Sequence, residues 1–297
     1  MRFARHETFH FREGWLTKGL RKLELEGLTD VFQRKDSMEE LGIGSNMVKS
    51  LRYWMQATSL TKERGAGKKQ QCLTNFGEVI YQYDRYLEQE ITLWLIHYHL
   101  ATNKEMATAW YWFFNIFDHK EFDEEMFISE LKYYISEADE EIAVGSLKKD
   151  FDCLISTYLL SNDITYNPEN NMGCPLQELG LVELIDNKRK RYRLTKRNVL
   201  NMPSELFLYG IFNYMKETGQ DELSIDSLLN DKKSIGQIFV LGFSELIHIL
   251  EILQAQGHIR VQKTAGLNRV TMLIHSDPLD IIKSYYQSEI GVYENER

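Results

Sequence analysis

The sequence has few cysteine and proline residues and no long uninterrupted apolar run. Its three cysteines, Cys72, Cys153 and Cys174, lie far apart, and none belongs to the C-x-x-C pair of a zinc site or a redox dithiol. We therefore expect reduced, mostly buried thiols. No apolar run reaches the roughly 18 residues that a membrane span needs, and the first residues hold no signal-peptide core. The sequence thus predicts a cytoplasmic protein that does not cross a membrane.

The sequence also lacks the common catalytic motifs. It contains no Gly-rich phosphate loop, no G-x-S-x-G turn, no H-E-x-x-H pair and no metal-nuclease pattern. His97 and His99 are two positions apart in an apolar helical segment, so they point to different faces and do not share a metal ion there. Any enzymatic activity would therefore use a site that standard motifs do not describe.

The charge of the chain is unevenly distributed. With 297 residues, of which 43 % are apolar and 27 % charged, the chain is long enough for several compact units. Its formal net charge of -9 argues against a general polyanion binder. The net charge is nevertheless +5 over residues 45–72, +7 over residues 187–198 and +3 over residues 257–272. These three segments are candidate nucleic-acid contacts on an acidic protein.

Residues 37–73 have the pattern of a helix-turn-helix followed by a β-hairpin. We expect Ser37 and Ser45 to cap a short and a longer helix, joined by a Gly-containing turn. Apolar residues at three- and four-residue spacing, Val48, Leu51 and Met55, should turn one face of the longer helix to the core. A polar and basic opposite face is what a recognition helix presents to base edges and phosphates. On that face we expect Asn46, Lys49, Ser50 and Tyr53. Lys49 and Arg52 would anchor phosphates, and Ser45, Asn46 and Tyr53 would approach base edges.

The stretch after this helix predicts two strands around a Gly- and Lys-rich tip, which together would form a wing. Its cations are Lys62, Arg64, Lys68 and Lys69. A helical hairpin that ends in a solvated basic loop is the alternative interpretation. The wing would add phosphate contacts beside the recognition helix.

The same plan recurs near the C-terminus. Ser224 should cap a helix, a long helix should run from Ser244 to a stop at Gly257, and two strands should follow at residues 258–263 and 269–274. The second hairpin carries Lys263 and Arg269. The long helix itself is acidic, with Glu245 and Glu251, so it suits contact with another protein chain as well as contact with DNA.

A weaker copy of the plan occupies the middle of the chain. We expect helices at residues 124–138 and 146–160, a break at residues 144–145, and a later hairpin with a cationic tip. The cations of that hairpin are Lys188, Arg189, Lys190, Arg191 and Arg193. Before it, residues 86–117 are apolar almost all round and hold Trp94, Trp110 and Trp112, which is typical of buried helices. An aromatic platform for stacked bases is the alternative.

These patterns predict a mainly α protein with small β-hairpin wings, built from tandem winged helix-turn-helix units around a Trp-rich helical centre. The expected parts are an N-terminal winged-helix unit at 1–85, a buried aromatic helical connector at 86–122, a middle helical or winged unit at 123–200 and a C-terminal winged-helix unit at 201–297.

The N-terminal segment holds the candidate catalytic residues His10, Arg12 and Glu13. Histidine can move a proton near neutral pH, and arginine can pair with phosphate. The same residues could equally form a polar segment that lies over a helix. Acidic residues at 118–125 could hold Mg²⁺ through oxygen ligands, although an acidic helix start accounts for most of them. The sequence therefore leaves the metal and its ligands unknown.

Five stretches of the sequence resemble a bacterial family long filed as of unknown function. They are FHFREGWLTKG, LGIGSNMVKSLRYWMQATSL, LTNFGEVI, TLWLIHYHL and ATAWYWFFN, in this order along residues 9–117. Genes of that family lie beside genes for sulfur-transfer enzymes that resemble phosphoadenosine phosphosulfate reductases, in DNA phosphorothioation and phage-defence clusters. The family includes SspB, described as the DNA-nicking component of such a system.

The resemblance implies a DNA-binding protein that works with a cysteine desulfurase, an ATP-dependent sulfur-transfer enzyme and an ATPase. It also implies a DNA-nicking activity, because sulfur enters the backbone only after the phosphodiester is opened or activated. From the residues themselves we add the expectation of a metal-dependent nicking endonuclease, with Mg²⁺ or Mn²⁺ held by an acidic neighbour of His10 and Arg12. The resemblance assigns no catalytic residues. Two alternatives stay open: a non-enzymatic winged-helix transcriptional regulator that binds DNA as a homodimer, and an adaptor that recruits the sulfur-transfer enzymes.

Overall fold

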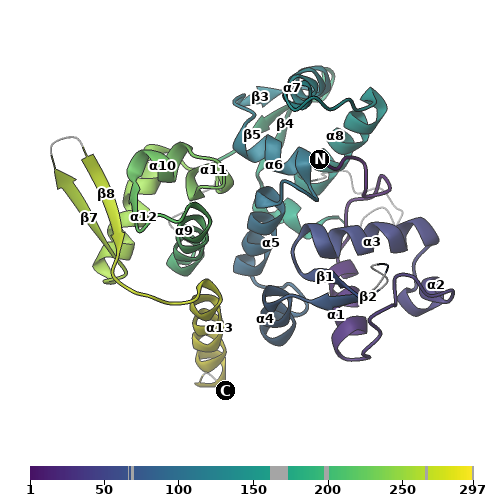
Figure 1. Ribbon diagram of the computed structural model, residues 1–297, viewed down its shortest axis with the longest axis horizontal. Helices are drawn as coiled ribbons and strands as arrows, with labels where there is room; N and C mark the ends of the chain where they lie inside the picture. Colours follow the sequence, from purple (N-terminus) through teal and green to yellow (C-terminus); the bar gives the residue numbers. More distant parts are fainter. Residues whose placement is uncertain (66, 68–69, 161–172, 197–200, 265–266, 296–297) are drawn as a thin grey trace. The chain divides into compact units, whose positions relative to one another are not determined.

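The computed structural model describes residues 1–65, 67, 70–160, 173–196, 201–264 and 267–295 (Figure 1). The chain divides into two compact units, Met1–Arg197 and Asn198–Arg297. Each unit is mainly helical and contains small antiparallel sheets. This architecture confirms the prediction of a mainly α protein with small β-hairpins.

The first part of unit 1 contains the predicted short helix, longer helix and hairpin. Strands β1 and β2 pair in antiparallel fashion from Thr61↔Leu73 to Arg64↔Gln70, which excludes the helical-hairpin alternative. The helix α1 packs against α3 and against β2, and α4 packs behind them. The elements are α1 (Trp15–Glu24), α2 (Ser37–Leu41), α3 (Ser45–Ala57), β1 (Thr61–Arg64), β2 (Gln70–Leu73) and α4 (Asn75–Asp84).

Two glycines let these elements approach closely. A Cβ at Gly19 of α1 would lie 2.7 Å from the Met55 sulfur of α3. A Cβ at Gly77 of α4 would lie 2.0 Å from the carbonyl oxygen of Leu60, just before β1. Thr74 caps α4, and its hydroxyl accepts a hydrogen bond from the Gly77 amide at 3.0 Å. The spacing between α4 and the hairpin therefore depends on the missing side chain at Gly77.

The expected caps of the first two helices are wrong by one position. Ser37 and Ser45 are the first helical residues, and Asp36 and Gly44 occupy the capping positions. The Ser37 hydroxyl instead donates a hydrogen bond back to the Arg34 carbonyl. Gly42 ends α2 with φ 62°, a left-handed conformation that glycine adopts without strain. The predicted glycine turn is confirmed, although the serines do not cap.

The helices α5 (Glu90–Thr102) and α6 (Thr108–Asn115) form the buried aromatic centre of unit 1 (Figure 1). Trp94, Trp110 and Trp112 are at most 2 % exposed, so the predicted buried helices are confirmed and the stacking platform is not available to bases. The centre contacts the N-terminal part through an edge-to-face pair of Trp54 with Trp110, whose ring centroids are 5.3 Å apart. It contacts the middle part through packing of α6 against α8 (Val144–Tyr158).

The middle part of unit 1 contains two helices and a three-stranded sheet with the order β3-β5-β4. Asp123 caps α7, and its carboxylate accepts a hydrogen bond from the Met126 amide at 3.0 Å. The expected break at residues 144–145 is wrong, because Val144 and Gly145 form the first turn of α8. The elements are β3 (Glu121–Phe122), α7 (Glu124–Ser136), α8 (Val144–Tyr158), the 3-10 helix η2 (Pro175–Leu179), β4 (Val182–Asp186) and β5 (Arg191–Leu194).

Unit 2 follows the predicted order of helices and hairpin. The Ser224 hydroxyl accepts a hydrogen bond from the Ser227 amide at 2.8 Å and caps α10. The apolar face of α12 is buried, and Gly257, with φ 76°, follows its end. The third strand, β6, completes a sheet of order β6-β8-β7. The elements are α9 (Ser204–Thr218), β6 (Glu222–Ser224), α10 (Ile225–Asn230), α11 (Ile235–Ile238), α12 (Phe243–Ala255), β7 (Ile259–Thr264), β8 (Leu267–Met272) and α13 (Pro278–Asn295).

Within the described ranges, no single helix has the length and apolar composition of a membrane span. One pair, residues 225–238 with Phe243–Ala255, meets the composition criterion together but is bent by 85°.

Candidate nucleic-acid interface

The exposed start of α3 is the centre of the candidate interface. Ser45, Asn46 and Lys49 are exposed, and the Lys49 ammonium donates a hydrogen bond to the Asn46 side-chain oxygen at 3.2 Å. The apolar face predicted from the sequence is buried, with Val48, Leu51 and Met55 at most 4 % exposed. The first turn of a helix directs amide hydrogens and a positive dipole end outward, which favours phosphate. The start of α3 therefore offers both polar side chains and the positive end of a helix dipole to a phosphate group.

Two residues expected on this surface are buried instead. Tyr53 is 6 % exposed and Ser50 is fully buried. The Ser50 hydroxyl and the Trp54 indole donate hydrogen bonds to the Phe9 carbonyl at 3.2 and 2.8 Å. The N-terminal segment thus covers the face of α3 that the helical period left exposed. Burial raises the pKa of Tyr53 well above its usual value, and this side chain is not placed to read a base.

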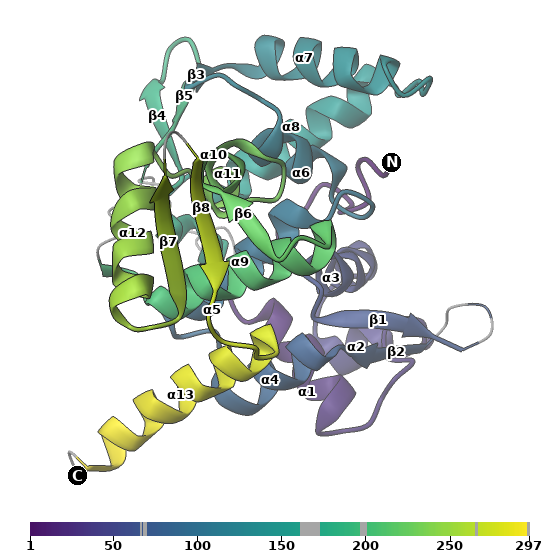
Figure 2. The ribbon, with the colours of Figure 1, turned by 60° about the vertical axis from the view of Figure 1, so that its left-hand side comes forward.

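The β1–β2 hairpin places further cations beside α3, as Figure 2 shows for the two strands. Lys62 and Arg64 are exposed on β1. Glu63 lies between them and pairs with Arg52 of α3 through a 2.8 Å contact between Nη2 and Oε1. The half-buried Arg52 therefore ties the helix to the hairpin, and its charge is largely balanced. Lys68 and Lys69 lie outside the described residues.

The second basic hairpin, β4–β5, is partly neutralised by acids from elsewhere in the chain. Arg193 contacts Glu121 at 2.8 Å and Glu183 at 2.9 Å, and Arg191 contacts Glu121 at 3.2 Å. The hydrogen bond from Arg193 lowers the pKa of Glu121. The two arginines hold the sheet together across its strands, which leaves less of their charge for a phosphate.

The turn of this hairpin keeps its cations exposed. The Asp186 carboxylate accepts hydrogen bonds from the Lys188 and Arg189 amides at 2.9 and 3.0 Å and orders the turn. Among the described residues, neither side chain has an ion-pair partner. Lys190 has φ 50° and donates a hydrogen bond to Asn187 at 2.9 Å. Lys188 and Arg189 are therefore the accessible cations of the hairpin.

A groove of about 630 Å³ joins this turn to the acidic start of α7. Arg189 and Lys190 line one side, and Asp123, Glu124 and Glu125 line the other. The sequence predicted both charged segments but not that they meet. Asp123 caps the helix and Glu124 pairs with Lys148 at 3.0 Å, so these two carboxylates already have structural roles. This supports the helix-start interpretation of the acidic segment.

The candidate catalytic residues do not converge on one cavity. Burial, and secondarily the nearby Arg12, lower the pKa of His10 to about 4. The guanidinium carbon of Arg12 lies 5.9 Å from the centre of the Trp15 ring. Glu13 is exposed and lines a cavity of about 560 Å³ that neither His10 nor Arg12 lines. The His10 imidazole is thus neutral at neutral pH, and it does not share a cavity with Glu13.

In unit 2, Arg269 is exposed and pairs with Glu222 through a 2.7 Å contact. The Lys263 side chain lies outside the described residues. Throughout the described part of the chain, no three His, Cys, Asp or Glu side chains come together in an arrangement that could hold a metal ion. Among the described residues we therefore assign no ligands to Mg²⁺ or Mn²⁺.

The fold and these surfaces define a mainly helical protein in which a helix pair followed by a β-hairpin occurs in both units, with exposed cations without an ion-pair partner among the described residues of the unit 1 pair and hairpin. A family model described as "Protein of unknown function (DUF4007)" matches residues 3–286, and the chain belongs to this family. The expected family membership is thereby confirmed.

Two solved structures are similar to the chain over nearly its whole length. The first is described as a magnesium ion-bound SspB crystal structure, with 24 % identity, a TM-score of 0.84 and coverage of 96 % of this chain and 88 % of that one. The second is described as an SspB crystal structure, with 25 % identity, a TM-score of 0.83 and the same coverage. The chain matches no curated protein. The similarity supports the resemblance to an SspB-containing family that the N-terminal sequence motifs indicated.

Proposed function

We propose that the chain is the DNA-binding component of a bacterial DNA phosphorothioation and phage-defence system. The observation that carries the proposal is the exposed cationic surface of α3 and β1. Lys49, Lys62 and Arg64 are exposed there, and none of them has an acidic partner among the described residues. Such a surface on a chain of net charge -9 is what local phosphate recognition requires.

In this proposal, unit 1 uses a winged-helix arrangement. The start of α3 enters a groove of the DNA, with Ser45 and Asn46 directed to base edges. Lys49, Lys62 and Arg64 contact phosphates. Lys68 and Lys69, which lie outside the described residues, are proposed as further phosphate contacts. Arg52 positions the hairpin through Glu63. The exposed Lys188 and Arg189 provide a second backbone contact.

The role within a phosphorothioation system rests on the family and on the similarity to SspB. We propose that the chain acts with a cysteine desulfurase, an ATP-dependent sulfur-transfer enzyme and an ATPase. Replacing a nonbridging oxygen by sulfur requires an activated or opened phosphodiester, and DNA nicking would meet this need.

For nicking, we propose His10 as the general base that removes a proton from the attacking water. Its imidazole is neutral at neutral pH and can accept a proton, although a pKa of about 4 makes it a weak base. Arg12 would contact the phosphate. Because the described side chains do not form a cage for a divalent ion, we assign no step of the reaction to a metal.

The test is incubation of supercoiled plasmid with the purified protein, in Mg²⁺, in Mn²⁺ and in EDTA. Conversion to the open-circular form by the wild type, and its loss in His10→Ala with unchanged DNA binding, would support nicking by His10. Full nicking by His10→Ala would remove this residue from the mechanism. A plasmid that stays supercoiled while a gel shift appears would leave the regulator or the adaptor.

The adaptor role has an observation of its own in its favour. The helix α12, which precedes the β7–β8 hairpin as α3 precedes the β1–β2 hairpin, contains no lysine or arginine. A regulator would instead protect one defined operator from cleavage. The salt dependence of DNA affinity distinguishes the adaptor from the two DNA-binding functions. Binding through several phosphates weakens steeply as the salt concentration rises, and an adaptor that contacts DNA weakly should not show this.

A further inference from the structure

The exposed face of α12 differs in chemistry from the exposed face of α3. Phe243, His248 and Glu251 are exposed on α12, and Glu245 and Ile247 are half-buried. Phe243 is 57 % exposed, and an aromatic side chain offers a large contact area to a partner that packs on it. The face thus combines an aromatic anchor with carboxylates.

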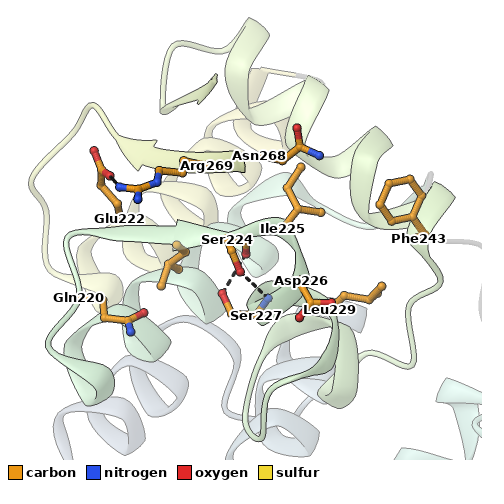
Figure 3. Close-up of a pocket in the computed structure, with 11 residues that line it drawn as sticks. Gln220, Glu222, Ser224, Ile225, Asp226, Ser227, Leu229, Phe243, Asn268 and Arg269 are labelled. Atoms are coloured by element: carbon orange, nitrogen blue, oxygen red, sulfur yellow. Dashed lines mark hydrogen bonds and ion pairs between the residues drawn. The ribbon is translucent and has the colours of Figure 1, made fainter. Parts of the chain in front are cut away.

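A groove of about 610 Å³ lies beside Phe243. Figure 3 shows Phe243 at one end of the groove, the Glu222–Arg269 ion pair at the other, and Ser224 between them. Leu223 and Ile225, which are at most 4 % exposed, supply apolar surface to the lining. Polar side chains, among them Ser224, Asp226 and Asn268, share the lining with these apolar ones. A pocket that combines apolar surface with polar groups can take up and orient a side chain of a partner.

Several polar groups of this groove already have partners within unit 2. The Ser227 hydroxyl donates a hydrogen bond to the Ser224 carbonyl at 2.9 Å. The Asp226 carboxylate accepts one from the Asn230 amide at 2.8 Å and remains exposed. Phe243 and the exposed Asp226 carboxylate are therefore the groups of the groove that a ligand meets with an apolar side chain and with a cation.

The charge of unit 2 selects the partner. Residues 198–297 contain thirteen Asp and Glu against eight Lys and Arg. The exposed cations Arg260 and Arg269 lie on the β7–β8 hairpin, whereas the charged residues of α12 are Glu245 and Glu251. The negative charge of α12 therefore favours a basic surface over a DNA backbone or a second copy of the same face. Arg269, which lines the groove, is paired with Glu222 and so does not offset the carboxylates of α12.

We propose that the acidic α12 face, defined as the exposed side of α12 together with the groove beside Phe243, binds a basic segment of another protein. An apolar side chain of that segment packs on Phe243 and the groove lining, and its Lys or Arg residues pair with Glu245, Glu251 and Asp226. The proposal does not depend on DNA binding by unit 1.

The experiment is fluorescence anisotropy of the full-length protein with two labelled peptides. One probe is a twelve-residue peptide of alternating Arg and Leu, and the second has Glu in place of each Arg. We expect binding of the first peptide alone, weakened about tenfold or more by Phe243→Ser and by Glu245→Lys with Glu251→Lys. Leu273→Ser, which changes another exposed apolar residue of unit 2, is the matched control and should leave the affinity unchanged.

Three results would overturn the proposal. They are no binding of the Arg-Leu peptide, equal binding of both peptides, and wild-type affinity in the α12 variants. Sedimentation of the same variants tests the other occupant, because a dimer that dissociates on Phe243→Ser would assign the face to self-association. Since Phe243 is exposed, its replacement should not prevent folding, and the thermal unfolding curve checks this. A gel shift with duplex DNA, which should be unchanged in Phe243→Ser, keeps this outcome separate from the function of unit 1.

Discussion

Replacing Gly77 by alanine tests whether the hairpin is held as closely to α4 as the structure shows. The added Cβ would lie 2.0 Å from the Leu60 oxygen and 3.0 Å from the Leu60 carbonyl carbon. Both atoms belong to the backbone, so a side-chain rotation cannot relieve the clash. Overpacking of this kind costs about 3 kcal/mol, offset by up to about 1 kcal/mol from the better helix propensity of alanine. The expected net loss is about 2 kcal/mol.

For a unit of this size, such a loss lowers the melting temperature by about 4 to 8 °C. Circular dichroism of thermal unfolding measures it, and DNA affinity should fall together with stability because Leu60 leads directly into β1. Gly145→Ala is the matched control. It also changes a helical glycine, but in the described structure no atom lies within 4 Å of its added Cβ, so stability should be equal or higher. Equal melting temperatures for the two variants would refute the close approach of α4 and β1.

Three further predictions concern charge, proton binding and base contact. Lys188→Ala with Arg189→Ala should reduce the salt slope of DNA binding by about 2, about 1 per lost phosphate contact, and an unchanged slope in a titration over salt would remove the turn from the interface. Because burial lowers the pKa of His10 from 6.5 to about 4, its contribution to stability is present above pH 6.5 and is lost as the pH falls toward 4. At pH 5 this lowers the free energy of unfolding by about 2 kcal/mol. In urea unfolding, His10→Asn should therefore lose correspondingly less stability than the wild type between pH 7 and pH 5. Equal losses for the two proteins would contradict the lowered pKa. In competition binding, Asn46→Ala should cost about 1 to 3 kcal/mol of discrimination between bases. Tyr53→Phe should cost none, because Tyr53 is buried. A loss of discrimination in Tyr53→Phe but not in Asn46→Ala would reject the placement of α3.

The sequence predicted the elements well where the signal is local. The turn at Gly42, the apolar face of α3, the β1–β2 hairpin and the cap at Ser224 all follow from residue spacing and backbone preference over a few positions. The buried aromatic helices also follow from composition alone. Such local rules set which segments become helices and strands.

The sequence could not show what covers each face. The helical period places Tyr53 opposite the core, but the N-terminal segment lies over it, with Phe9 accepting the hydrogen bonds of Ser50 and Trp54. In the same way, Arg193 pairs with Glu121, 72 residues earlier in the chain. Contacts between such distant positions depend on the packing of the whole unit, so the number of accessible cations is smaller than the basic runs suggest.

The most direct test of the account is the affinity of the full-length protein for a labelled DNA duplex, measured over a range of salt concentrations. The wild type should bind with an affinity that falls steeply as salt rises, with a slope of about 0.9 per phosphate contact. Lys49→Glu with Lys62→Glu and Arg64→Glu should weaken binding to all sequences and flatten the slope by about 3. A variant that binds as tightly as the wild type, with the same slope, would contradict the assignment of α3 and β1 as the DNA-binding surface.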